Sequence, residues 1–239
     1  MNKKEFVLGH KKLVSLACGL HNLANRFCTK ITGENNRIIA PCALLKKTNI
    51  RIKGSNNTLI IGDFTRAIGA SIYINGNNNR IVIGDWGYLK ETDLFIEDDG
   101  GSIVIGNAAK IIGKTYMAVI EGTSITIGDG CIFSHDVQFR TGDGHSILDM
   151  QGRRINESRD IVVGNHVWFG TKVYCTKGAR IGSHCIVGTG ALVTKDLAES
   201  YCTLAGVPAK IVKRGTDWSM RRIPVGEIAA DFVPPVTEE

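Results

Sequence analysis

The sequence predicts an all-β solenoid of the parallel β-helix type, and a six-residue period is the first observation that predicts it. In the stretch from Val163 to Asp196, the first residue of every six is aliphatic, Phe or Cys, and the fifth is small and apolar. The first positions are Val163, Phe169, Cys175, Ile181, Val187 and Val193, and the fifth positions are Val167, Val173, Ala179, Cys185 and Ala191. This period matches neither an α-helix nor a half-buried strand, but it is typical of a parallel β-helix, in which three sixes form one triangular coil of ~18 residues.

A longer repeat in the first half of the chain is the second observation. Ile39, Ile61, Ile83, Ile105 and Ile127 are spaced by 22 residues. Because 22 is 18 plus 4, we expect each early coil to carry one enlarged corner. Residues 75–79, Asn-Gly-Asn-Asn-Asn, have the side chains that left-handed and turn backbone favours. We therefore predict a β-helix over residues 31–200, with about seven coils.

Composition is the third observation. Among 239 residues, 43% are hydrophobic but only 7% are aromatic, and 28 are glycines, which suits a narrow interior with tight corners. The net charge of +6 is too small to favour nucleic acid, although it favours an anionic partner. Cys131, Cys175 and Cys185 fall at inward positions and none of the seven cysteines forms a CxxC motif, which predicts reduced thiols and a cytoplasmic protein.

The two ends of the chain differ from the solenoid. Within residues 1–30, helical spacing of apolar residues predicts an amphipathic helix over residues 3–28 that caps the solenoid or contacts a neighbouring subunit, with a membrane surface as the alternative. These residues are Phe6, Leu13, Ala17, Leu20, Ala24 and Phe27. No stretch is long and apolar enough to span a membrane. Residues 201–239, with Trp218 and Pro234-Pro235, form a predicted C-terminal extension.

One interval breaks the period. Ile127 and Val163 are 36 residues apart, which fits either two coils or one coil with an external loop. Residues 142–159 are polar and aperiodic, so we expect a loop that projects from the solenoid, and long loops on rigid scaffolds often carry function. This loop contains His145.

At these residues the sequence resembles the hexapeptide-repeat acyltransferases, whose β-helix is left-handed. The resemblance covers roughly residues 120–214 and rests on the loop histidine and on four further motifs. These are Gly164-Asn165-His166-Val167-Trp168-Phe169-Gly170, Gly188-Thr189-Gly190, Val193-Thr194-Lys195-Asp196 and the stretch from Ala205 to Lys213. The chain is similar to galactoside and maltose O-acetyltransferases, and most of all to capsular polysialic acid and related polysaccharide O-acetyltransferases.

The resemblance implies roles for individual residues. His145 would act as general base on a sugar hydroxyl, a task that suits imidazole with its ordinary pKa near ~6.5. Trp168 would form a wall beside the thioester, and the backbone N–H of Thr171 would stabilise the oxyanion. We assign His135 and Asp143 to the acceptor side, and Asp143 is also a candidate to orient the His145 ring. No serine or cysteine stands in a motif with a histidine, which favours direct transfer over an acyl-enzyme.

The donor implied by the resemblance is acetyl-CoA, bound along the last coils. The Thr189-Gly190 corner would let the pantetheine arm approach the backbone, with Thr194 and Ala205 making main-chain contacts. Lys195, Lys210 and Lys213 would meet the phosphates. His166 and His184 are 18 residues apart and should stack on adjacent coils, but the sequence offers no third ligand, so we predict no metal.

The most favoured function is therefore an acetyl-CoA-dependent O-acetyltransferase of a bacterial surface polysaccharide, either capsule or O-antigen. Family habit implies a homotrimer with active sites between subunits. Two alternatives stay open at this point. The acceptor could be small, such as a free sugar, a nucleotide sugar or an antibiotic, or the chain could be a non-catalytic β-helix that serves as a binding module.

Overall fold

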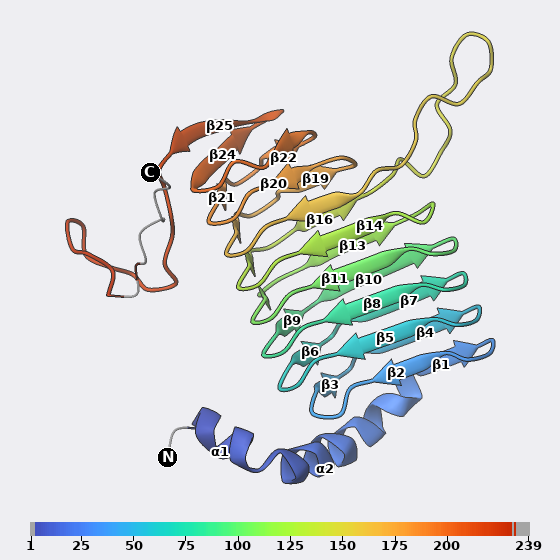
Figure 1. The fold of residues 1–239 in the computed structure, drawn as a ribbon. Helices are drawn as coiled ribbons and strands as arrows, with labels where there is room; N and C mark the ends of the chain where they lie inside the picture. The colour runs from blue at the N-terminus through green and yellow to red at the C-terminus, as the bar shows by residue number, and fades with distance from the viewer. Residues whose placement is uncertain (1–2, 231, 233–239) are drawn as a thin grey trace, which may run out of the picture.

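The computed structural model describes residues 3–230 and 232, and its main body is a triangular prism of stacked coils (Figure 1). Each coil contributes one strand to each of three sheets, here called sheets A, B and C, and neighbouring coils pair in parallel. The chain passes from sheet A to B to C and back to A. This arrangement confirms the predicted parallel β-solenoid.

Among the described residues, sheets A and B hold eight strands each and sheet C holds nine. Sheet A contains β1 (Thr29–Thr32), β4 (Asn49–Lys53), β7 (Ser71–Asn75), β10 (Thr92–Glu97), β13 (Thr115–Val119), β16 (Val137–Arg140), β19 (Tyr174–Thr176) and β22 (Leu192–Val193). Sheet B contains β2 (Arg37–Ile39), β5 (Thr58–Ile61), β8 (Arg80–Ile83), β11 (Ser102–Ile105), β14 (Ser124–Ile127), β17 (Ile161–Val163), β20 (Arg180–Ile181) and β23 (Asp196–Leu197). Sheet C contains β3 (Leu44–Lys46), β6 (Arg66–Ile68), β9 (Tyr88–Lys90), β12 (Lys110–Ile111), β15 (Ile132–Phe133), β18 (Trp168–Phe169), β21 (Ile186–Val187), β24 (Cys202–Gly206) and β25 (Ala209–Arg214).

The inward positions of the hexapeptides form the core, as predicted. The first and fifth residues of the sixes between Val163 and Val193 are at most 3% exposed. In the middle of the prism, the ring of Phe169 stacks on Phe133 with centroids 4.8 Å apart and meets Phe139 edge-on at 5.4 Å. Because each coil buries only a few side chains, the core is a continuous column that depends on neighbouring coils.

Strand register corrects two details of the predicted repeat. Sheets A and B hold eight strands each among the described residues, so the prism has eight coils instead of seven. The 22-residue period holds from Ile61 to Ile127, but Ile39 pairs with Ile60, because the first coil is one residue shorter. Ile39 is consequently 45% exposed, and its neighbour Ile38 packs against the core.

The 36-residue interval is one coil with an external loop. Ile127 pairs directly with Val163, and residues 141–160 leave the prism between β16 and β17. This corner, where sheet A leads into sheet B, is called the AB corner below. The loop is the long projection at the upper right of Figure 1.

In the early coils the AB corner is widened by buried asparagines. Asn57 and Asn79 are at most 1% exposed, and the N–H of Asn79 donates to Asn57 Oδ1 at 2.9 Å. Asn79 in turn accepts from Gly101 N–H at 2.7 Å. Asn78 and Gly76 have positive φ, as the Asn-Gly-rich stretch predicts. The amide ladder satisfies the backbone groups that the wider corner buries.

The N-terminal segment is helical, as predicted, and its apolar face does not pack on the solenoid. It comprises α1 (Lys3–Gly9), α2 (Lys11–Asn22) and a 3-10 turn, η1 (Leu23–Cys28), beneath the first coil (Figure 1). Contacts with the solenoid include Cys18, an ion pair between Lys11 and Asp63, and hydrogen bonds from the side chains of Asn22 and Asn25 to the β3 region. The predicted apolar face points outward, since Leu13 and Leu20 are 58% and 62% exposed. The side chains of Phe6 and Phe27 lie outside the described part.

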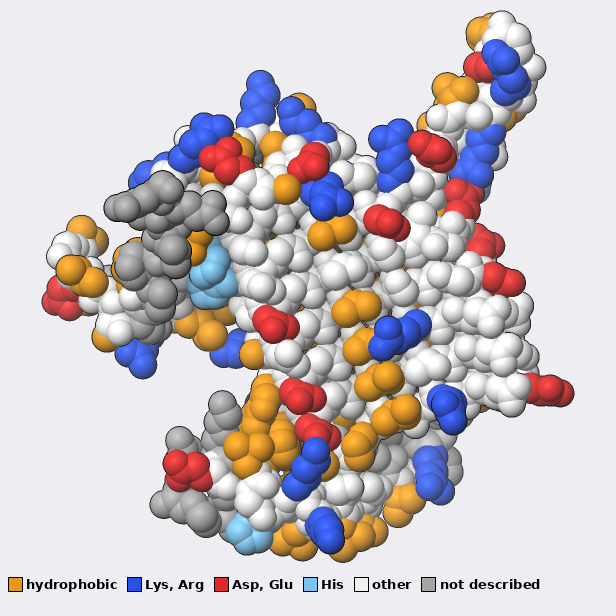
Figure 2. Space-filling view, viewed as in Figure 1, with side chains coloured by type: hydrophobic (Ala, Val, Ile, Leu, Met, Phe, Trp, Pro, Cys, Tyr) orange, Lys and Arg blue, Asp and Glu red, His pale blue; other side chains and the backbone are white. Residues whose placement is uncertain are grey.

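The C-terminal segment extends the last coil before it leaves. β24 and β25 form an antiparallel pair on the edge of sheet C, so the regular fold continues to Arg214, past the predicted boundary at residue 200. Residues 215–230 then run back along the prism without regular strands (Figure 1). In the same view, Figure 2 shows Lys and Arg side chains gathered at the upper end of the molecule and on the projecting loop. Pro234-Pro235 lies outside the described residues.

Candidate active site

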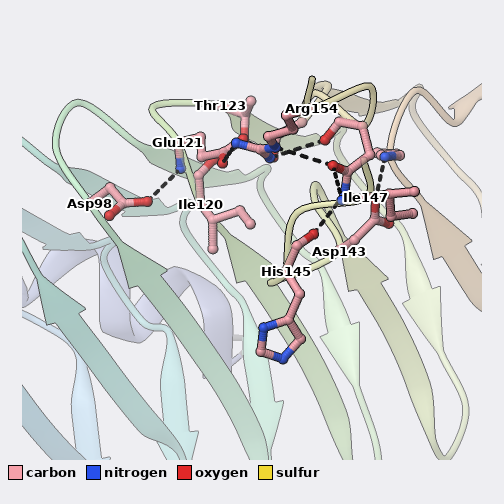
Figure 3. A network of polar contacts seen from close by, with 11 residues as sticks. Asp98, Ile120, Glu121, Thr123, Asp143, His145, Ile147 and Arg154 are labelled. Atoms are coloured by element: carbon pink, nitrogen blue, oxygen red, sulfur yellow. Dashed lines mark hydrogen bonds and ion pairs between the residues drawn. The ribbon is translucent and has the colours of Figure 1, made fainter. Parts of the chain in front are cut away.

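The predicted catalytic histidine lies on the projecting loop with its ring directed away from the loop's polar network (Figure 3). His145 is exposed, and its backbone carbonyl accepts a 2.8 Å hydrogen bond from Asn156 Nδ2. Within the described residues, no hydrogen bond reaches its imidazole. The loop thus holds the backbone of His145 and leaves the ring available to an external group.

Asn156 is the centre of this loop and was not predicted from the sequence. It is 6% exposed, and its Nδ2 also donates to Asp143 Oδ2 at 2.8 Å, while its Oδ1 accepts from Ile147 N–H at 2.8 Å. One buried amide therefore ties together the two sides of the loop around His145. A single asparagine in a polar aperiodic stretch offers no sequence signal for this role.

Asp143 does not orient the His145 ring within the chain. Its carboxylate is bound to Asn156 and to the ammonium group of Lys177, which lies on the next coil. Lys177 and, after it, Asn156 lower the pKa of Asp143 below its ordinary value. Asp143 therefore stays ionised near neutral pH and holds the loop base.

A second ion pair holds the other side of the loop base. Arg154 Nη1 lies 2.5 Å from Glu121 Oε1, and Ser158 Oγ donates to Glu121 Oε2 at 2.7 Å. Both contacts favour the charged carboxylate, Arg154 most strongly, and they lower the pKa of Glu121 to about 2. The loop is thus attached to the prism by two carboxylates of permanent charge near neutral pH.

The residues predicted around the thioester lie elsewhere, on sheet C and at the corner that leads from sheet C to sheet A, called the CA corner. Trp168 projects from the outer face of sheet C and is 41% exposed. Thr171 follows at the CA corner, and within the described residues no acceptor takes its N–H. Gly190 N–H donates to the Thr171 carbonyl at 2.9 Å, so Thr189-Gly190 stacks directly beside it.

Close approach between these coils depends on glycine. A Cβ on Gly170 would meet the backbone nitrogen of Thr189 at 2.7 Å, whereas the space beside Gly190, at φ +74°, is open. Ala205 on β24 pairs with Lys210 on β25, and Lys213 lies on the same strand. The region therefore offers exposed backbone with lysines at its end, as a pantetheine arm and its phosphates would need.

The structure divides the predicted site into two groups. The loop half-site, at the AB corner, contains His145, Asp143, Lys177, Thr194 and Lys195. The sheet C half-site contains Trp168, Thr171, Thr189, Gly190, Ala205, Lys210 and Lys213. His135 belongs with the second group, because it lies at the CA corner one coil before Thr171, away from the loop base near which it was expected.

The two half-sites cannot meet within one chain. In a triangular prism the AB corner is opposite sheet C, and the hydrophobic core lies between them. Figure 1 shows the loop projecting from the side of the prism opposite the strands of sheet C. Within one chain, the core therefore separates His145 from the Trp168 region.

The buried cysteines are poor nucleophiles. Burial raises the pKa of the Cys131 thiol to about 12 and that of Cys202 to about 11, and it raises the pKa of Cys175 as well. Since the thiolate is the reactive form, these residues act as small hydrophobic side chains. This agrees with the prediction that transfer needs no acyl-cysteine.

Known proteins of similar sequence are acetyltransferases. Polysialic acid O-acetyltransferase from Neisseria meningitidis is 31% identical over 218 residues, which cover 85% of this chain and 88% of that protein. The polysialic acid O-acetyltransferase of Escherichia coli O1:K1 / APEC is 39% identical over 94 residues, which are 39% of this chain but only 30% of that protein. No family model matches the chain.

Solved structures give the same result. The crystal structure of NeuO, described as a polySia-specific acetyltransferase, has a TM-score of 0.74 and 32% identity, covering 84% of this chain and 91% of that one. The polysialic acid O-acetyltransferase OatWY has a TM-score of 0.66 and 26% identity, covering 82% of this chain and 94% of that one.

A hexapeptide solenoid with a projecting histidine loop defines the class of this protein, which is that of the β-solenoid acetyltransferases. Within this class, the alignment with the Neisseria protein extends over most of both chains. The chain therefore belongs to the polysialic acid O-acetyltransferase family.

No helix among the described residues is both long enough and apolar enough to cross a membrane.

Proposed function

We propose that this chain transfers the acetyl group of acetyl-CoA to hydroxyl groups of an anionic bacterial capsular polysaccharide, in active sites formed between subunits of a homotrimer. The observation that carries the proposal is the placement of two complementary half-sites on opposite sides of one prism. In a ring of identical chains, the AB corner of each subunit lies against sheet C of the next. Because the ring is closed, every loop half-site is paired with a sheet C half-site.

His145 acts as the general base in this mechanism. An alcohol is a weak nucleophile until its proton is removed, and an exposed imidazole on a braced loop can take that proton as the oxygen attacks the thioester carbonyl. The carbon–sulfur bond then breaks, and the imidazolium of His145 gives its proton to the departing CoA thiolate. The base is thereby regenerated, so acetyl transfer leaves no covalent intermediate on the protein.

The sheet C half-site stabilises the donor and the developing charge. The N–H of Thr171 lies in an open corner and donates to the oxyanion of the tetrahedral intermediate. The pantetheine arm lies along Thr189, Gly190 and Ala205, and Lys210 and Lys213 neutralise the phosphates. Trp168 forms the wall beside the thioester and restricts water there.

An anionic polymer as acceptor is supported by the relatives and by charge. Two relatives that match this chain are named as polysialic acid O-acetyltransferases. The chain has a net charge of +6, and Arg153, Arg159 and Lys195 lie exposed on or near the loop half-site. The AB corner runs along eight coils, which gives an extended chain more surface than a free sugar needs. The free thiols agree with action in the reducing cytoplasm.

The direct test is acetyl transfer to candidate acceptors, followed by release of the CoA thiol and by the acetyl mass increment on the glycan. Activity with a sialic acid polymer, and its loss by ~10²–10⁴-fold in His145→Ala, is the expected result. Equal activity with free sialic acid would contradict the polymer as acceptor. Full activity in His145→Ala would contradict the mechanism.

A further inference from the structure

The corner that leads from sheet B to sheet C, called the BC corner, carries a cluster of polar side chains that the proposed acetyl transfer does not use. Equivalent corner positions on successive coils are Ala108, Gly130, His166, His184 and Tyr201, all with positive φ. The first two are small, and residues 217–229 together with Phe232 lie over them and border a half-open cavity of about 610 Å³. His166, His184 and Asp217 all line this cavity.

Asp217 is the third ligand that the sequence did not offer. One donor atom from each of His166, His184 and Asp217 lies within 4.8 Å of the other two. Asp217 Oδ2 is 3.1 Å from His184 Nδ1, and Oδ1 is 3.5 Å from His166 Nε2. We propose that these three residues bind a divalent transition-metal ion, with Zn²⁺ as the preferred ion, and that the ion fastens the C-terminal segment to the solenoid.

The spacing of the donors supports this assignment. Ligands about 2.0–2.1 Å from a tetrahedral zinc ion lie roughly 3.3 Å from each other. Each histidine nitrogen is near this distance from one of the two Asp217 oxygens, and the three donors, one from each residue, lie within 4.8 Å of one another. The set of two imidazoles and one carboxylate suits zinc and its neighbours better than magnesium or calcium, which prefer oxygen. The carbonyl oxygen of Trp218 is 2.9 Å from His166 Nε2 and can complete the coordination.

The surroundings hold the histidines in place. The ring of Trp218 stacks on His166 with centroids 4.1 Å apart, and its Nε1 donates to the His166 carbonyl at 2.8 Å. Tyr201 stacks on His184 at 4.6 Å. Both histidines also sit on rigid corners of adjacent coils, so ligand binding does not require them to be ordered first. The cavity provides the path by which the ion enters.

The same atoms can form hydrogen bonds without a metal, and the experiment separates the two arrangements. Full-length protein is treated with EDTA, desalted and titrated with Zn²⁺ by calorimetry, and Co²⁺ is added to a second sample to record visible absorption. We expect one tight site per chain and the absorption bands of a tetrahedral cobalt site. Asp217→Asn keeps one amide oxygen for hydrogen bonding but removes the charge, and should weaken zinc binding by at least ~10–100-fold.

His184→Ala should abolish the cobalt bands, whereas His21→Ala, which changes an exposed histidine on α2, should leave binding unchanged. Thermal unfolding followed by circular dichroism verifies that each variant is folded. The proposal would be overturned if wild-type protein bound no zinc, or bound it no more tightly than Asp217→Asn does. His166, His184 and Asp217 would then hold the C-terminal segment by hydrogen bonds alone.

Discussion

Active-site sharing can be tested by mixing two inactive variants. His145→Ala removes the proposed general base of the loop half-site, and Trp168→Ala removes the proposed wall of the sheet C half-site. Each variant alone should lose ~10²-fold or more in kcat/KM, because both the base and the alignment of the thioester are needed. His145 and Trp168 lie on opposite sides of the prism, so each variant keeps intact the half-site that the other variant has lost.

The expected recovery follows from the number of intact pairings. A trimer site is intact when one subunit supplies His145 and its neighbour supplies Trp168. In random trimers from an equal mixture of the variants, each condition is met half the time, so about a quarter of the sites regain activity. The assay is acetyl transfer to the glycan by co-expressed, co-purified variants, compared with each variant alone.

A second mixture provides the control. Wild type mixed equally with the double variant His145→Ala/Trp168→Ala should also give about a quarter of the wild-type activity if sites are shared, but about half if each chain works alone. Sites within one chain would further give no recovery in the first mixture. Half of the wild-type activity in the second mixture, together with no recovery in the first, would refute the conclusion that the two half-sites belong to different chains.

Three further predictions concern pH, packing and donor binding. Glu121 has a pKa of about 2 when folded, below its ordinary 4.5, so its pairing with Arg154 stabilises the protein above about pH 4.5 and this stability is lost as pH falls toward 2. Thermal unfolding of Glu121→Gln should therefore differ from wild type at pH 6 and converge with it near pH 2; a constant difference would contradict the pairing. Phe169→Ala should cost ~3–5 kcal/mol in urea unfolding, since the ring is fully buried between two other rings, and a loss below 1 kcal/mol would contradict that packing. Gly170→Ala should raise KM for acetyl-CoA by roughly 10-fold at nearly unchanged acceptor KM, because the new Cβ displaces the backbone of Thr189; an unchanged donor KM would place CoA elsewhere.

Two orientations could not be predicted from periodicity. Ile39 continues the 22-residue spacing, yet the first coil is one residue shorter and turns this side chain outward. The apolar face of the N-terminal helix points outward, and Lys11, Cys18, Asn22 and Asn25 contact the solenoid. In both cases periodicity identified the element correctly, whereas its orientation depended on which neighbour it meets.

The sequence by itself determined the solenoid and the projecting loop, because the hexapeptide pattern is local and every coil buries the same positions. It also supplied the residues to which the reaction is assigned in the proposal. Tertiary structure alone decided which residues stand together. Asn156 beside His145, Lys177 beside Asp143 and Asp217 beside two histidines are separated along the chain by 11, 34 and 33 or more residues. Such contacts depend on the summed lengths of strands, corners and loops around the prism, and a change of one residue in any coil would rotate them apart.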